Sequence, residues 1–69
     1  MPRGIVKWYN PNRGFGFISP EDGTEVVFAD CEDIVGKFKE LKEGLEVDYK
    51  VLNFKKGKQA VEIKMLNRN

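Results

Sequence analysis

The stretch Arg13-Gly14-Phe15-Gly16-Phe17-Ile18 decides the fold of this chain, because it alternates glycine with phenylalanine. Successive side chains of a β-strand point to opposite faces, so Phe15 and Phe17 share one face while the glycines and Ile18 share the other. Glycines cannot fill a core, but they let a barrel wall curve tightly while Ile18 fills the interior. We therefore expect both phenyl rings on the outer face beside Arg13, and exposed rings normally mark a binding surface.

The segment 25–30 is predicted to be a strand with the same division of faces. Val27 and Ala29 are small and apolar, which suits them to the interior. Phe28 and Asp30 have the opposite parity and therefore share the outer face. A third ring and one carboxylate are thus expected near the first two rings.

The segment 4–10 contributes an indole ring and a cation. Trp8 comes directly after Lys7, whereas Tyr9 has the opposite parity to Trp8 and suits a structural position. Strands that are neighbours in sequence usually pair, so the outer faces of the three segments should merge. The expected patch consists of Trp8, Phe15, Phe17 and Phe28, with Lys7 and Arg13 next to it.

Exposed rings beside basic side chains are what a single-stranded nucleic acid requires of a protein surface. Each base can stack on an aromatic ring, which contributes about 1–3 kcal/mol, and the cations can meet the phosphates. The alternative is that these aromatics form the core, as most aromatics do. The alternation with glycine argues against this alternative for Phe15 and Phe17.

The composition excludes several other classes of function. A chain of 69 residues predicts a single domain over residues 1–69, and the absence of histidine removes the His-dependent hydrolase triads. Cys31 is the only cysteine, so we expect neither a disulfide framework nor a zinc site. We predict no enzymatic activity, no metal and no small-molecule cofactor. No apolar run approaches the roughly 20 residues that cross a membrane, so we expect a cytoplasmic protein without a membrane partner.

Glycine and proline divide the whole chain into short elements, which is typical of an all-β fold. The predicted strands cover residues 4–10, 15–19, 25–30, 45–54 and 59–66. The apolar face of the strand 45–54 carries Leu45, Val47, Tyr49 and Val51. The apolar face of the strand 59–66 carries Val61, Ile63 and Met65. The connection between the third and fourth strands has room for one helical turn, near residues 32–35. Five short strands of this kind suit a small closed barrel.

These residues resemble the bacterial cold-shock protein family. The match is most specific over residues 6–10 and 13–18, and it continues through Val27-Phe28, Phe38-Lys39, Leu41, Glu43-Gly44, Val47 and Gly57. The resemblance implies a five-stranded antiparallel OB-type barrel that binds single-stranded RNA and DNA, as an RNA chaperone or a regulator of transcription or translation. The binding positions that it implies are Lys7, Trp8, Arg13, Phe15, Phe17, Phe28, Phe38 and Lys56.

Residues 27–31 correspond to the second ribonucleoprotein motif of this family, and they depart from its usual sequence. The family usually has Val-Phe-Val-His-Phe, whereas this chain has Val27-Phe28-Ala29-Asp30-Cys31. Asp30 places on the predicted binding face a carboxylate that can only accept hydrogen bonds. We therefore include Asp30 among the site residues, where it lowers affinity or selects a base. Cys31 is interpreted as a small, half-buried side chain, because no basic neighbour in sequence would activate it as a nucleophile.

The segment Asn53-Phe54-Lys55-Lys56-Gly57-Lys58 is a cluster of basic residues in a chain whose net charge is only +1. It is either a solvated hairpin tip or a set of phosphate contacts that compensates for the altered motif. Phe54 either continues the apolar face past a bulge or provides an extra stacking ring.

Two rival interpretations use the same residues. An RNA-recognition motif also contains an Arg-Gly-Phe-Gly-Phe run, but Ser19 and Pro20 end the strand here and two amphipathic helices are missing. A barrel of the same fold that binds a protein or peptide stays open, because fold does not fix function. We expect a monomer.

Overall fold

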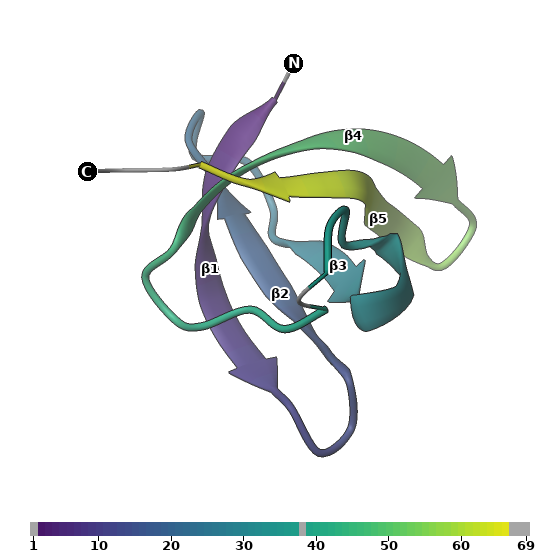
Figure 1. Ribbon diagram of the computed structural model, residues 1–69. Helices are drawn as coiled ribbons and strands as arrows, with labels where there is room; N and C mark the ends of the chain where they lie inside the picture. The colour runs from purple at the N-terminus through teal and green to yellow at the C-terminus, as the bar shows by residue number, and fades with distance from the viewer. Residues whose placement is uncertain (1, 38, 67–69) are drawn as a thin grey trace.

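The computed structural model describes residues 2–37 and 39–66, which contain five β-strands and one short 3-10 helix. The strands are β1 (Arg3–Asn10), β2 (Phe15–Pro20), β3 (Val27–Asp30), β4 (Glu46–Phe54) and β5 (Gly57–Met65), and the helix is η1 (Cys31–Asp33). The strands close into a barrel in the order β1-β2-β3-β5-β4 (Figure 1). The all-β barrel predicted from the sequence is therefore confirmed.

The strands are antiparallel at every junction of this barrel except one. The pairs β1–β2, β2–β3, β1–β4 and β4–β5 are antiparallel, whereas β3 and β5 are parallel, with Phe28 opposite Gln59 and Ala29 opposite Ala60. The cause is the long connection after β3, which carries the chain across the barrel so that β4 lies beside β1 (Figure 1). The β4–β5 hairpin then returns β5 along β3 in the same direction.

The connection between β3 and β4 completes the core. It begins with η1, close to the helical turn expected near residues 32–35. Ile34 forms a parallel bridge with Ile63, and both Ile34 and Leu41 are buried. In residues 2–37 and 39–66 no helix has the length and apolarity needed to cross a membrane.

Most inward-facing side chains are those that alternation predicts. Ile18, Val27, Ala29, Val47 and Tyr49 are each at most 2% exposed, so these predicted interior positions of β2, β3 and β4 are confirmed. Val51, also expected inside, is partly buried and packs against the core. With Ile18 inside, the phenylalanines on either side of Gly16 face outward.

Gly16 has a more specific role than curvature alone. A Cβ atom at this position would lie 2.2 Å from the carbonyl oxygen of Trp8 and 2.8 Å from the Cα of Tyr9. Atoms do not approach a backbone this closely without a shift, so glycine allows β1 and β2 to lie together here. The close approach brings Trp8 next to Phe17.

A β-bulge in β1 determines which way the indole ring faces. Lys7 is the extra residue between two register pairs, so Val6 and Tyr9 are both buried although they are three residues apart. Lys7 and Trp8 both lie on the outer surface. The predicted outward position of Trp8 and the structural position of Tyr9 are thus confirmed.

A second bulge, in β5, makes one predicted interior position wrong. Glu62 has a φ of +49°, and the register with β4 shifts next to it. Ala60 and Ile63 are consequently the fully buried residues, whereas Val61, which was expected inside, is only partly buried. The bulge changes the parity between these positions, which strict alternation cannot anticipate.

Candidate nucleic-acid interface

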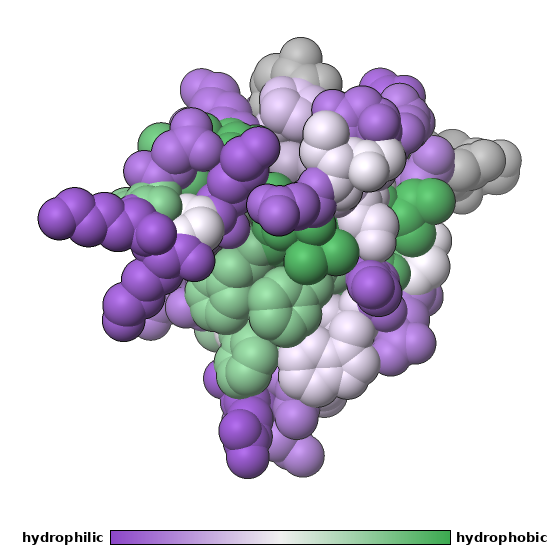
Figure 2. All heavy atoms as spheres, turned by 180° about the vertical axis from the view of Figure 1, so that it is seen from behind, coloured by the Kyte–Doolittle hydropathy of each residue, from purple (hydrophilic) through white to green (hydrophobic). Residues whose placement is uncertain are grey.

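Four aromatic rings lie side by side on the outer surface of β1, β2 and β3. The register places Trp8 opposite Phe17 and Phe17 opposite Phe28, with Phe15 two residues away on β2. Centroids of neighbouring rings are 5.6 Å apart for Trp8 and Phe15 and 6.5 Å apart for Phe15 and Phe17. We call Trp8, Phe15, Phe17 and Phe28 the aromatic face. Figure 2 shows hydrophobic surface gathered in the middle of one side of the barrel, with hydrophilic groups projecting around it.

The rings of the aromatic face hold one another in place. Trp8 and Phe17 are stacked with an interplanar angle of 28°, whereas Phe15 and Phe17 meet edge to face at 88°. Trp8 is 38% exposed and the phenyl rings are partly buried. Because these contacts already restrict the side chains, a ligand that stacks on them would cost little further side-chain entropy.

Basic side chains surround the aromatic face. Lys7 lies at the bulge of β1, Arg13 in the turn after β1, and Lys56 in the turn after β4, and all three are exposed. The ion pairs within the described part of the chain are Arg3–Asp48 at 3.1 Å and Lys50–Glu62 at 3.2 Å, and they involve none of these three cations. Their charges are therefore available to phosphates.

The side chain of Asn10 organises the turn that carries Arg13. Its Oδ1 accepts hydrogen bonds from the backbone N–H groups of Asn12 at 2.9 Å and Arg13 at 3.2 Å. Gly14 closes the turn with a φ of +76°, a conformation that favours glycine. Since Asn10 lies opposite Phe15 in the register, the turn holds Arg13 near one end of the aromatic face.

Asp30 lies at the edge of the aromatic face and also caps η1. It is opposite Phe15 in the β2–β3 register, and its carboxylate accepts a hydrogen bond from the backbone N–H of Glu32 at 3.3 Å. An N-cap of this kind typically contributes about 1 kcal/mol. This capping role is not among the roles predicted for Asp30 above, although an aspartate directly before a predicted helical turn is a signal for it.

Cys31 packs under the β1–β2 turn. Its side chain lies against the core and its backbone N–H donates to the carbonyl of Gly14 at 2.9 Å. Burial is the main cause that raises the pKa of the Cys31 thiol, and the side chain of Asp30 raises it further. Both effects disfavour the reactive thiolate. The predicted role as a small, half-buried side chain is confirmed.

An apolar groove adjoins the aromatic face at the β4–β5 hairpin. It has a volume of about 510 Å³, and Phe17 and Phe28 contribute to its wall together with hairpin residues 54–59. Phe54 lines this groove and is 55% exposed. No local sequence pattern predicts this groove, because its two sides meet through the pairing of β3 with β5, which lie far apart in the chain.

The structure brings together all the predicted site residues that it describes. Lys7 and Arg13 flank the aromatic face, Asp30 borders it, and Lys56 lies at the groove. Phe38, which the resemblance assigned to binding, lies outside the described residues. That these side chains bind a nucleic acid stays a prediction.

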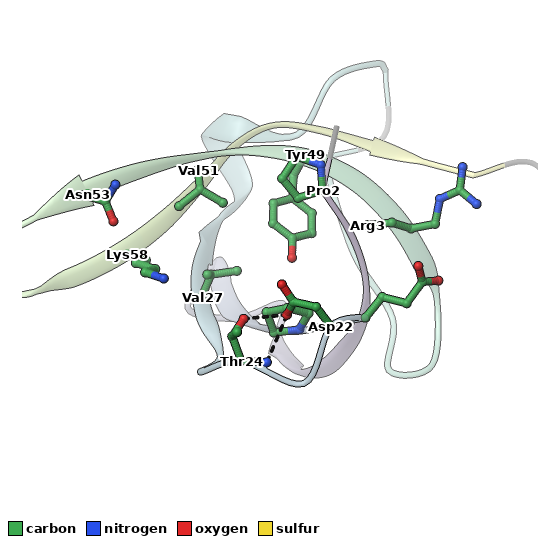
Figure 3. Close-up of a pocket in the computed structure, with 11 residues that line it drawn as sticks. Pro2, Arg3, Asp22, Thr24, Val27, Tyr49, Val51, Asn53 and Lys58 are labelled. Carbon is green, nitrogen blue, oxygen red and sulfur yellow. Dashed lines mark hydrogen bonds between the residues drawn. The ribbon is translucent and has the colours of Figure 1, made fainter.

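A second hollow, of about 550 Å³, lies between the β2–β3 turn and β4 (Figure 3). The hydroxyl of Tyr49 points toward Asp22, which accepts hydrogen bonds from the backbone N–H of Thr24 at 3.0 Å and from its hydroxyl at 2.6 Å. These bonds lower the pKa of Asp22. Cations and carboxylates both line this hollow, so it has neither the uniform charge nor the clustered rings of the aromatic face.

Comparison with known proteins places the chain in a family. Residues 2–66 match the family described as 'Cold-shock' DNA-binding domain. Probable cold shock protein A of Mycobacterium tuberculosis is 43% identical over 67 residues, which cover 96% of this chain and 100% of the relative. Cold shock-like protein CspI of Escherichia coli is 46% identical over 61 residues, which cover 87% of each chain.

A solved structure supports the fold independently. The structure described as drosophila Unr CSD456 has a TM-score of 0.80 with this chain, and the match covers 99% of this chain and 27% of that one. At 24% sequence identity this is a likeness of fold. With the family match and the curated relatives, it leads to one conclusion: the chain belongs to the family of cold-shock DNA-binding domains.

Proposed function

We propose that this protein binds single-stranded RNA and DNA by stacking bases on the aromatic face and holding phosphates with Lys7, Arg13 and Lys56. The observation that carries the proposal is the contiguous group of four rings, with centroids 5.6–6.5 Å apart, bordered by exposed cations. Membership of a family described as a DNA-binding domain supports a nucleic-acid ligand. Asp30 and Phe38 complete the proposed set of site residues.

The geometry favours a single strand over a duplex. In a duplex the bases stack on one another, so their faces are not free to lie on protein rings. In a single strand successive bases can lie on successive rings, and each stack contributes about 1–3 kcal/mol whatever the base. Binding would therefore be tolerant of sequence, with affinity tuned by the surrounding charges.

From this mode of binding we infer a role as an RNA chaperone or a regulator of transcription or translation. A strand whose bases lie on the aromatic face cannot pair with another strand at the same time, so binding opposes RNA secondary structure. The protein would act as a monomer in the cytoplasm, as a binding protein without a cofactor. Relatives named as cold shock proteins are consistent with this role.

A peptide-binding barrel is the second candidate, because Leu52 and Phe54 are 48% and 55% exposed on β4. The net charge of +1 also gives little overall attraction for a polyanion. The nucleic-acid function is preferred because the rings are accompanied by cations that form no ion pair with another described residue.

A fluorescence titration distinguishes the two candidates. Trp8 is the only tryptophan, so its emission reports on the aromatic face alone. We expect oligothymidine and a U-rich RNA to quench this emission saturably, and a blunt duplex of the same length to leave it nearly unchanged. The absence of quenching by either single strand at low salt would favour the peptide-binding barrel.

A further inference from the structure

We propose that the β4–β5 hairpin provides an additional base-stacking site, in which Phe54 receives one further nucleotide of the strand that lies on the aromatic face. The inference rests on the proposed function and extends it beyond the four rings. It commits to a nucleotide as the occupant of the groove between Phe28 and the hairpin.

The position of Phe54 places its ring on the ligand side of the barrel. It is the last residue of β4 and pairs with Gly57 across the hairpin. It has the parity of Leu52, and both side chains are exposed, whereas Val47 and Tyr49 of the opposite parity are buried. A ring left 55% exposed at a hairpin tip makes little contribution to the core.

The groove makes Phe54 continuous with the aromatic face. The β3–β5 register sets Phe28 opposite Gln59, and the β4–β5 register sets Gln59 opposite Leu52. The outer row of side chains that starts at Trp8 and Phe17 thus runs without interruption onto the hairpin. The groove of about 510 Å³ contains both Phe28 and Phe54 in its wall, which allows a base to lie there after the last ring of the face.

The charges of the groove favour a polyanion over an apolar peptide as its occupant. Lys55, Lys56 and Lys58 all line it, and no carboxylate is among its lining residues. An adjoining hollow, which shares Lys56 and Lys58, adds one carboxylate, that of Glu25, and Gln59 of the groove wall donates a hydrogen bond to the carboxylate of Asp33 at 2.7 Å. Three cations around one aromatic side chain suit a base with its flanking phosphates, whereas an apolar peptide would leave these charges uncompensated.

The first test is a length series measured by quenching of Trp8. Oligothymidines that grow one nucleotide at a time would be titrated into the wild type, Phe54→Ala and Ile5→Ala. Ile5→Ala is the matched control, because it removes an apolar side chain of β1 that is 47% exposed, pairs with Ser19 and lies neither in the groove nor in the outer row that leads to it. We expect wild type and Ile5→Ala to gain affinity up to the same length.

In Phe54→Ala we expect the gain to stop one nucleotide earlier, with affinity for the longest oligomer reduced roughly 5- to 150-fold, the equivalent of one stacked base. Affinity for the shortest oligomers should be unchanged. Equal affinities of wild type and Phe54→Ala at every length would overturn the additional site. Absence of quenching in the wild type would instead overturn the proposed function, so the two failures are distinguishable.

The second test reads the groove directly. In Trp8→Phe/Phe54→Trp the only tryptophan lies at the hairpin, while ring character is kept at both positions. Its emission should respond to long oligothymidines and not to the shortest ones that wild type binds. A response that is the same at all lengths, or absent at all lengths in a variant that still binds, would contradict the proposal.

Discussion

Replacing Asp30 by asparagine tests how the altered motif affects binding. Asp30→Asn removes the negative charge beside Phe15 but keeps a side-chain oxygen that can accept from the N–H of Glu32, so the cap of η1 should persist. At a separation of roughly 8 Å, Coulomb's law in water gives about 0.5 kcal/mol of repulsion for each phosphate near the carboxylate. One or two such phosphates predict an affinity increase of about 2- to 5-fold at low salt.

The increase should shrink at high salt, because the Debye length falls to about 3 Å at 1 M. Asp30→His should strengthen binding further at low salt, since it adds a ring, but it removes the cap and should also lower the free energy of unfolding.

Glu21→Gln is the matched control, because it removes the same charge beside the second hollow. The assay is Trp8 quenching at two salt concentrations, with urea unfolding to follow the cap. An unchanged affinity of Asp30→Asn would place Asp30 outside the path of the ligand, and a weaker affinity for one base composition would make it a specificity contact.

Three further predictions concern the stacking rings, the cations and the glycine that brings β1 and β2 together. Phe15→Ala or Phe17→Ala should weaken oligonucleotide binding by about 1–3 kcal/mol each while circular dichroism shows an intact barrel, and unfolding of both variants would mean that the rings are core. The logarithm of the binding constant should fall with the logarithm of the salt concentration, with a slope of about −0.7 for each phosphate contacted. Lys7→Ala or Arg13→Ala should each make that slope shallower. A salt-independent affinity would indicate a peptide ligand. Gly16→Ala should destabilise the fold by about 1–3 kcal/mol or more in urea unfolding, because its Cβ would lie 2.2 Å from a backbone oxygen, and a variant as stable as wild type would refute this reading of the β1–β2 contact.

Local alternation was enough to predict the centre of the aromatic face. Around Phe15 and Phe17 each neighbouring residue is either glycine or the buried Ile18, so only one assignment of faces gives a filled core. Val27 and Ala29 constrain β3 in the same way. Where the side chains of one face are much smaller or more apolar than those of the other, the pattern alone determines which face is inside.

Features that depend on backbone irregularity or on distant pairing could not be predicted in this way. The bulge at Glu62 exchanges Val61 for Ala60 in the core, and its positive φ occurs in a residue type that gives no signal for it. The parallel β3–β5 pairing, and with it the groove beside Phe28, follows from the path of the connection after Asp30 rather than from any local pattern. The groove lined by Phe54 therefore became visible only in three dimensions.

The most direct test of the central claim is to map where a single strand contacts the barrel. Nitrogen-15-labelled protein would be titrated with oligothymidine while amide and indole resonances are followed by NMR. We predict that the largest chemical-shift changes occur at the indole N–H of Trp8 and at the amides of Phe15, Phe17 and Phe28. The amide resonance of Thr24, beside the second hollow, should not shift. Shifts centred on the hollow around Thr24, or no shifts at saturating oligonucleotide, would contradict the proposal that the aromatic face binds single strands.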